Sequence, residues 1–357
     1  MAVLGIMTHA SRNPRRYESY AREAERLGFE ATLLFGPGDV DLRGRRVEAF
    51  RYGGGEWRRR PCPLPDIAHD MGFYTDPIAT GLAKRVKSVR SGIPFTGYAL
   101  GHKWKIHETL LRTEFAKYVP ETALLRTPNA AVKLAARYGA VMVKPRNGKQ
   151  GKGIVKISRA PGDASRFQWQ ERSANAGPLA PAELTERLRD RFRPSSAVVQ
   201  RWMDIRCPEG GVFDIRALVQ KTEGDAWLTT EMAVRQSGLG RIASNVSDGG
   251  VVRSVPSFVA KLYGADEAAR IVEECRRIAA GLPAALEAAY GKRFVELGID
   301  LAVEKGGHVR IIEVNIKPGK KIVRALSGEK AYADALLRPI RYAKWLSDRR
   351  DSLWKGS

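Results

Sequence analysis

The sequence has 357 residues, 43% of them hydrophobic, and its 61 lysines and arginines against 39 aspartates and glutamates give a formal net charge of +22. This composition predicts a globular protein of two or three domains, and the lack of both an apolar run of about 18 to 20 residues and a signal-peptide pattern argues for a cytoplasmic protein without a membrane span. The charge permits binding to nucleic acid, an anionic surface or an acidic substrate, but no nucleic-acid module accompanies the scattered arginines, so no specific nucleic-acid binding is expected.

Residues 1–95 have the pattern of a small α/β domain. We expect strands at residues 3–7 and 31–35, helices at residues 16–27 and 77–88, and a loop at residues 53–61. The first strand is not followed by G-x-G-x-x-G, so no dinucleotide site is expected here. We predict that this domain helps to shape a substrate site.

Two lysines, Lys103 and Lys105, mark the start of an amphipathic helix in the segment GHKWKIHETL. The segment also contains two histidines, but it lacks the H-E-x-x-H pattern, so a zinc site is not expected. A solvated lysine at the start of a helix is the alternative interpretation of Lys103.

Residues 141–157, VMVKPRNGKQGKGIVKI, predict a glycine-rich hairpin. Its glycines can adopt positive φ and bring backbone N–H groups close to phosphate oxygens, while its lysines supply positive charge. A strand pattern resumes after the loop, so this is not a Walker A loop, and we predict a flap over a triphosphate. The candidate residues are Lys144, Gly148, Lys149, Gln150, Gly151, Lys152 and Gly153.

The middle of the chain holds further candidates for nucleotide and substrate contacts. A buried strand runs into Gln200, Arg201, Trp202 and Met203, which could lie beside an adenine, although core packing of Trp202 is an equal alternative. Two predicted strands then carry Asp214, Arg216 and Arg235, and the loop that follows contains Asn245. Structural salt bridges are an equally ordinary use for the two arginines. Helices are expected at residues 258–290 and 332–349, the second with a kink at Pro339.

Alternating residues in the segment 294–321 predict a β-hairpin. A two-residue Gly306-Gly307 turn would pair Lys305 with His308. In the second strand, simple alternation places four residues on one face, namely Val309, Ile311, Glu313 and Asn315.

This register brings oxygen donors together on the hairpin. Asp300 would face Glu313, and Asn315 would face Gly298. Two facing carboxylates repel unless a cation lies between them, and Asp, Glu and Asn oxygens suit Mg²⁺ or Mn²⁺ better than Zn²⁺. The alternative is a pair of acids that point to solvent.

Seven motifs occur along the chain in the order GHKWKIHETL, VKPRNGKQGKGI, VVQRWMDI, FDIRALVQK, MAVRQSGLGRIASNVSDGG, ELGIDLAV and IIEVNIKPGKKI. Together they resemble the ATP-grasp superfamily, and more narrowly the YheC/YheD group of endospore coat-associated proteins, with RimK-type amino-acid ligases as better understood relatives. The resemblance implies an α/β and α+β ATP-grasp fold. It divides the chain into an N-terminal α/β domain (1–95), a small subdomain with a glycine-rich lid (96–199), a C-terminal subdomain with a metal site (200–330) and a basic C-terminal helix (331–357).

The resemblance also implies a set of functional residues. Those that would bind ATP are Lys103 or Lys105, Lys144, the lid residues 148–153, the hinge residues 200–203 and Asp214 at the ribose. Those that would bind Mg²⁺ or Mn²⁺ are Asp300, Glu313 and Asn315. Those at the transferred phosphate and acyl group would be Arg216, Arg235 and Asn245. Many family members have an acid where this chain has Gln200, which puts the adenine contact in doubt.

The function implied by the resemblance is an ATP- and Mg²⁺-dependent carboxylate–amine ligase. It would act through an acyl-phosphate on an acidic peptide or an amino acid, and it would need no protein nucleophile. The alternative is a catalytically retired nucleotide-binding protein of the spore coat. The resemblance implies coat association, and the oligomeric state, with a homodimer as one option, is left open.

Overall fold

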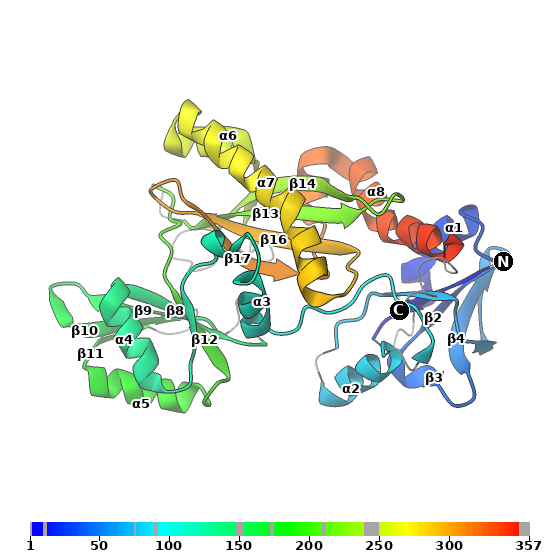
Figure 1. Cartoon of the computed structure of the whole chain (residues 1–357), viewed down its shortest axis with the longest axis horizontal. Coiled ribbons are helices and arrows are strands. Elements are labelled where there is room, and N and C mark those ends of the chain that lie inside the picture. The colour runs from blue at the N-terminus through cyan, green and yellow to red at the C-terminus, as the bar shows by residue number, and fades with distance from the viewer. Residues whose placement is uncertain are drawn as a thin grey trace.

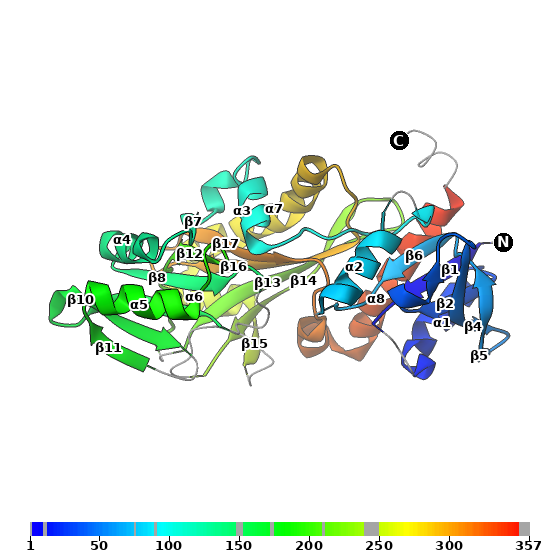
Figure 2. The same cartoon turned by 90° about the horizontal axis from the view of Figure 1, so that it is seen from below.

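The computed structural model describes residues 2–9, 13–74, 76–88, 91–147, 153–171, 175–208, 211–238 and 250–349. Three β-sheets with their helices lie in a row, with the N-terminal sheet at one end and the sheet of the glycine-rich hairpin at the other (Figures 1 and 2). Within the described ranges, no helix is both long enough and apolar enough to cross a membrane.

The N-terminal sheet has the strand order β3-β4-β2-β1-β6, with β5 paired to β4. Its elements are β1 (Val3–Met7), η1 (Pro14–Tyr17), α1 (Glu18–Arg26), β2 (Ala31–Phe35), η2 (Pro37–Asp39), β3 (Val40–Asp41), β4 (Arg46–Gly53), β5 (Glu56–Pro63), β6 (Ile67–Asp70) and α2 (Pro77–Val86). The two predicted strands are confirmed. The predicted loop at 53–61 is wrong, because residues from Glu56 onward form β5, where Trp57 packs against Tyr52 with ring centroids 5.1 Å apart.

The second sheet has the order β11-β10-β9-β8-β12-β7 and carries the glycine-rich hairpin between β8 and β9. Its elements, together with the segment that leads into it, are α3 (Lys103–Leu110), η4 (Ala116–Tyr118), β7 (Thr122–Leu124), α4 (Pro128–Tyr138), β8 (Ala140–Pro145), β9 (Val155–Ala160), β10 (Asp163–Glu171), β11 (Asn175–Leu179), α5 (Pro181–Arg191) and β12 (Ala197–Arg201). Helices α4 and α5 pack on this sheet through a core that includes Val143, Ile157 and Leu188.

The third sheet is antiparallel, with the order β15-β14-β13-β16-β17. Its elements are β13 (Phe213–Lys221), β14 (Trp227–Gln236), β15 (Val251–Ser254), α6 (Val255–Tyr263), α7 (Ala265–Tyr290), β16 (Glu296–Val303), β17 (Val309–Asn315) and α8 (Lys321–Asp348). Odd-numbered residues of β13 and β16, such as Ile215 and Ile299, pack under α6 and α7. Even-numbered residues face the opposite side, where α8 covers Leu218.

Helix α8 connects the third sheet to the N-terminal domain. Residues near its start, Ile322 and Val323, pack on the third sheet, whereas Ile340 and Leu346 belong to the same core as strand β1. The helix continues through Pro339, where a kink was expected, and its backbone leaves helical geometry at Gly328, which has a φ of 81°. The C-terminal helix therefore completes the core of the first domain and fixes it against the third sheet.

The proline in α8 has a consequence for the neighbouring sheet. Proline lacks an N–H, so the carbonyl four residues before it receives no helical hydrogen bond. That carbonyl belongs to Ala335, and Gln220 on β13 donates to it with Nε2 2.8 Å from the oxygen. The contact ties α8 to the end of β13.

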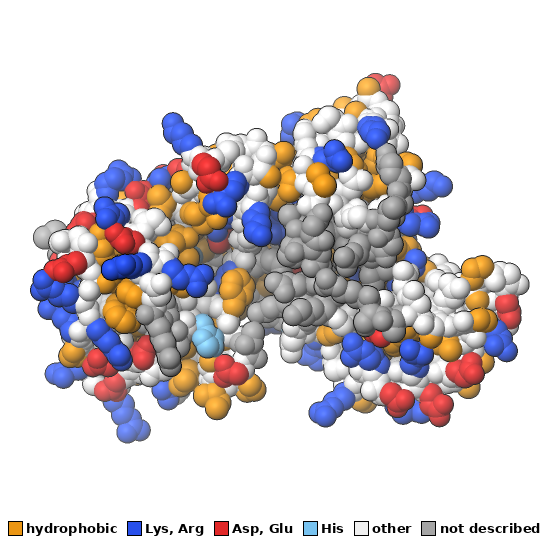
Figure 3. Space-filling model, turned by 180° about the vertical axis from the view of Figure 1, so that it is seen from behind, with side chains coloured by type: hydrophobic (Ala, Val, Ile, Leu, Met, Phe, Trp, Pro, Cys, Tyr) orange, Lys and Arg blue, Asp and Glu red, His pale blue; other side chains and the backbone are white. Residues whose placement is uncertain are grey.

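Basic side chains do not form one band on the face shown in Figure 3. Lysines and arginines are scattered there among acidic and uncharged residues. On this face, such scattered cations favour solvation and long-range attraction of anions.

Candidate functional site

The hairpin of β16 and β17 has the predicted register at its functional end. Asp300 pairs with Glu313, and Gly298 pairs with Asn315. The predicted turn is wrong, because Glu304, not Lys305, is hydrogen bonded to His308, with a distance of 3.0 Å between Glu304 N and His308 O. The turn is one residue longer than expected.

A β-bulge at Ile312 corrects the register and switches the face of the strand. Leu301 pairs with Ile311 but Asp300 pairs with Glu313, so Ile312 is the extra residue. Simple alternation placed Glu313 on the same face as Ile311, and that interpretation is wrong, because Ile311 lies in the core under α7. Bulges commonly reorient side chains beside functional sites. Here the bulge moves Glu313 and Asn315 out of the core and beside Asp300.

Asp300 is the centre of a buried network of charges. Arg216 on β13 lies directly opposite it and donates through Nε and Nη2, the latter at 2.9 Å. Arg235 on β14 approaches Asp300 at 3.1 Å and also binds Asp214, with its Nε 2.6 Å from Oδ1. Burial alone would raise the pKa of Asp300, but Arg235 and Arg216 outweigh this effect and lower it. The carboxylate is therefore held in its ionised form.

The start of α3 brings a lysine to the second carboxylate of the pair. Lys103 forms an ion pair with Glu313. Lys105 instead places its ammonium 5.5 Å from the centroid of the Tyr290 ring. The imidazole of His102 caps the helix by accepting from the backbone N–H of Lys105, at 3.1 Å. Of the two candidate lysines, Lys103 is the one that contacts Glu313.

Lys144 reaches the same place from β8 in the second sheet. Its Nζ donates to Oε1 of Gln200 at 2.6 Å, and Gln200 in turn donates to Thr122. Burial, with a further contribution from the nearby Lys103, lowers the pKa of Lys144 to about 8. An acid at position 200 would have paired with Lys144 and opposed this shift, so Gln200 leaves Lys144 with less support for its charge.

The other predicted hinge residues have varied surroundings. Arg201 forms an ion pair with Glu304, 2.8 Å away, while Met203 is buried. Trp202 is half-buried and stands outside the buried hydrophobic clusters found among the described residues. The ammonium of Lys156 lies 4.3 Å from the centroid of one of its rings. The core-packing alternative for Trp202 is therefore not favoured.

Several predicted residues lie outside the described part of the chain, namely Gly148, Lys149, Gln150, Gly151, Lys152 and Asn245. Gly153 is described and has a φ of 71°, the positive value expected of a glycine at the end of the lid.

The site as described combines three carboxylates with four basic side chains. The carboxylates are Asp214, Asp300 and Glu313, and the basic side chains are Lys103, Lys144, Arg216 and Arg235. No group of three or more His, Cys, Asp and Glu side chains suited to a metal occurs in the ranges that the structure describes. The predicted metal set depends instead on two carboxylates and the amide of Asn315. The excess of one positive charge suits an anionic ligand.

The protein family that this sequence matches is consistent with the geometry of the site. The family described as YheC/D like ATP-grasp matches residues 92–346. This chain belongs to the YheC/D-like ATP-grasp family. Two curated relatives from Bacillus subtilis (strain 168) are similar over most of the chain. Endospore coat-associated protein YheD is 25% identical over 90% of this chain and 73% of its own length, and endospore coat-associated protein YheC is 23% identical over 92% of both.

Solved structures show that this ATP-grasp chain shares its fold with known ligases. D-alanyl-alanine synthetase A from Vibrio cholerae has a TM-score of 0.55 at 11% identity, with 96% of this chain and 98% of that chain covered. N5-carboxyaminoimidazole synthetase from Staphylococcus aureus, solved in complex with ADP, has a TM-score of 0.52 at 11% identity, with 95% and 77% covered. These similarities confirm the ATP-grasp fold.

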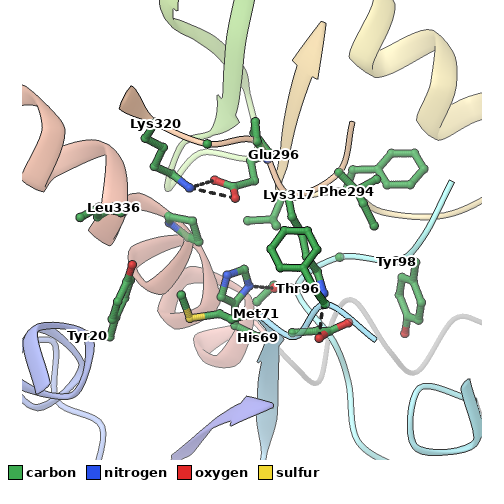
Figure 4. A pocket seen from close by; sticks show the side chains of 18 of the residues that line it. Tyr20, His69, Met71, Thr96, Tyr98, Phe294, Glu296, Lys317, Lys320 and Leu336 are labelled. Carbon is green, nitrogen blue, oxygen red and sulfur yellow. Dashed lines mark hydrogen bonds and ion pairs between the residues drawn. The ribbon is translucent and has the colours of Figure 1, made fainter. Parts of the chain in front are cut away.

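A cavity of about 260 Å³ lies at the start of β16 in this ATP-grasp protein, where Glu296 lines it (Figure 4). Its walls come from the N-terminal domain, the start of β16, the segment 316–320 and α8. Its charged lining residues are Asp70, Lys87, Glu296, Lys317 and Lys320, none of which the sequence analysis singled out as a site residue. One signal was available for Glu296, because it shares a strand face with Asp300 by simple alternation.

Proposed function

We propose that this ATP-grasp protein is an ATP-dependent carboxylate–amine ligase. The observation that carries the proposal is the meeting of two facing carboxylates, Asp300 and Glu313, with basic side chains from three separate parts of the chain. Fixed cations in a partly buried site stabilise the charge that develops during phosphoryl transfer. Family membership and the fold shared with ligases support the same proposal.

The proposal includes Mg²⁺ as the metal that accompanies ATP. Mg²⁺ commonly binds one or two carboxylates and completes its shell with water and phosphate oxygens. Asp300 and Glu313 are such carboxylates, and Asn315 follows Glu313 on the same strand face. These residues therefore fit the ion, although Asp300 must first exchange part of its contact with the two arginines. When bound, the metal would neutralise phosphate charge.

The remaining residues have roles that follow from their charge. Lys103 and Lys144 would bind the phosphates of ATP, and Arg216 and Arg235 would hold the transferred phosphate and the substrate carboxylate. A carboxylate oxygen attacks the γ-phosphorus, and the bond to ADP breaks. The amine of the second substrate then attacks the acyl carbon, the bond to phosphate breaks, and the amine loses a proton to solvent. The carboxylate substrate is an amino acid or the carboxylate of an acidic peptide.

Assays of substrate-dependent ADP and phosphate release test the proposal. We expect release only when a carboxylate and an amine are both supplied, and Lys144→Ala should abolish it because the phosphates lose a half-buried cation. Lys133→Ala, in the same subdomain on α4, is the matched control and should retain activity. Release that is independent of added substrates, or unchanged in Lys144→Ala, would contradict the assignment.

A structural role in the spore coat is a second candidate. The names of the two curated relatives favour coat association, which we propose for this chain as well. A purely structural protein would bind ATP but give no turnover with any pair from a wide panel of amino acids, peptides and spore extracts. Turnover with any one pair of these substrates would show that the protein is an enzyme.

A further inference from the structure

Strand β16 connects the cavity to the charged network, because Glu296 at its start lines the cavity and Asp300 lies further along the strand. Glu296, Gly298 and Asp300 alternate on that strand and therefore share one face. Successive residues on a face are roughly 7 Å apart, so Gly298 lies midway between the cavity and Asp300. A Cβ at Gly298 would lie 2.7 Å from Pro318 and 3.2 Å from Nη1 of Arg216. Arg216 therefore lies between the cavity and the proposed phosphoryl-transfer site.

One wall of the cavity is formed by a buried ion pair. Lys320 places its ammonium 3.0 Å and 2.8 Å from the two oxygens of Glu296, and the side chains of these residues are only 10% and 6% exposed. Gln220 donates to Glu296 at 2.9 Å and holds the carboxylate in place. An ammonium group has three donors and a carboxylate has about four acceptor positions. Lys320 can therefore donate one further hydrogen bond to a ligand, and Glu296 can accept one from it.

The second charged wall, which contains Asp70, Lys87 and Lys317, has no free acceptor for the ammonium group of a ligand. Asp70 already accepts from Lys87 and Lys317, and also from Tyr74 and the backbone N–H of Gly72, all within 3.0 Å. This carboxylate is fully engaged. The ion pair of Glu296 and Lys320 is therefore the part of the lining best suited to bind a charged ligand.

His69 lines the cavity near Lys320 but adds no charge to it. His69 places its Nδ1 2.8 Å from the hydroxyl of Thr96. Burial, together with the nearby Lys320, lowers its pKa to about 3, so the imidazole is neutral at physiological pH. The charge that a ligand meets at this end of the cavity is therefore that of Glu296 and Lys320 (Figure 4).

We infer that this cavity binds a free α-amino acid, with its ammonium group on Glu296 and its carboxylate on Lys320, as one of the two organic substrates. A ligand with a single charge would add one uncompensated charge beside the intact buried pair, which is unfavourable. A zwitterion supplies both charges, so every buried charge keeps a counterion. The inference rests on the proposed ligase function and specifies its substrate.

The remaining lining favours an apolar side chain on that amino acid. Tyr20, Tyr332, Leu336 and Pro339 line the cavity from α1 and α8. The cavity volume of about 260 Å³ is just below the roughly 300 Å³ at which pockets for drug-sized ligands begin. This size suits a single amino acid and excludes a folded partner.

Calorimetric titration of the full chain without nucleotide tests the inference. The probes are leucine and phenylalanine in both enantiomers, with phenylalanine amide and 3-phenylpropionate as analogues that keep only one of the two charges. We expect at least one amino acid to bind, and its single-charge analogues to bind at least tenfold more weakly. Equal binding of the analogues, or no binding of any amino acid to the folded protein, would overturn the inference.

Three variants connect the binding to the ion pair. Glu296→Gln and Lys320→Met should each weaken amino-acid binding at least tenfold, whereas Lys344→Met, which removes a half-buried lysine of α8 that pairs with Asp348, should not change it. The double variant Glu296→Gln/Lys320→Met leaves no unpaired charge, so it should fold and should lose the preference for the zwitterion. A preserved preference in the double variant would overturn the inference. Because these measurements contain no ATP, they can fail while ATP binding and turnover succeed, and the reverse also holds.

Discussion

Arg216 lies opposite Asp300 on adjacent strands and binds both oxygens of its carboxylate, with Nη2 2.9 Å from Oδ2. Arg235 approaches the same carboxylate at 3.1 Å. Both arginines and Asp300 are buried. Asp300 therefore stabilises the ligand-free protein by compensating two cations, and in the proposed reaction it exchanges part of this contact for metal.

Replacement of Asp300 by asparagine should destabilise the protein. Asp300→Asn keeps the shape but leaves two buried guanidinium groups with less compensation, and the loss of one partner of a buried ion pair costs about 3–5 kcal/mol. Denaturant unfolding would measure the loss. Glu267→Gln, which weakens the exposed pair with Arg270, is the control and should change stability by no more than about 1 kcal/mol. Equal small effects of both variants would show that the buried network contributes little.

The two lysines of α3 should differ in their effect on ATP. Lys103→Ala should weaken ATP binding about 10- to 100-fold, since hydrogen bonds to charged groups contribute about 1.5–3 kcal/mol. Lys105→Ala is the matched control, because its ammonium lies against Tyr290, and it should leave the affinity unchanged. Calorimetry with Mg²⁺ present would measure both. A larger loss in Lys105→Ala would assign the phosphate contact to the other lysine.

The affinity for ATP should depend on the charge of Lys144. The pKa of about 8 means that Lys144 loses its charge as the pH rises through this value, and a phosphate binds the charged form. The affinity should therefore fall above pH 8, by at most about tenfold per pH unit. Gln200→Glu adds a carboxylate beside the ammonium and raises its pKa, so the fall should move to higher pH. Identical pH profiles for the two proteins would argue against this role of Lys144.

Gly298 should not tolerate a side chain. A Cβ there would lie 2.7 Å from Cβ of Pro318, and overpacking of this kind typically costs about 1–3 kcal/mol. Gly298→Ala should therefore displace the segment 316–320 or Arg216, and it should lower both stability and turnover. Gly319→Ala, with no atom within 4 Å of the added Cβ, is the control. Thermal unfolding and the ADP-release assay would show whether the two variants differ as expected.

The hairpin shows how far the sequence alone can specify the site. Alternation and the register of an assumed two-residue turn at Gly306-Gly307 led to the correct prediction that Asp300 pairs with Glu313. The longer turn and the bulge at Ile312 were not predictable, because two glycines are compatible with several turns and a bulge leaves no mark on simple alternation. The two errors cancel, because the longer turn shifts the strand pairing by one residue and the extra residue Ile312 shifts it back.

The buried charge network and the cavity could not be predicted from the sequence, for a different reason. Arg216 and Asp300 meet only because β13 lies next to β16, and strand order is a property of the whole sheet. The lining of the cavity likewise combines residues as distant in sequence as His69 and Leu336. Local patterns specify strands and helices, but such neighbours depend on long-range packing.

A crystal structure with Mg²⁺ and a non-hydrolysable ATP analogue tests the central claim most directly. We predict that the triphosphate contacts Lys103 and Lys144, that the metal binds Asp300, Glu313 and Asn315, and that at least one of Arg216 and Arg235 turns from Asp300 toward the γ-phosphate. A nucleotide bound elsewhere, or bound here with both guanidinium groups still on Asp300 and no metal on that carboxylate, would contradict the account.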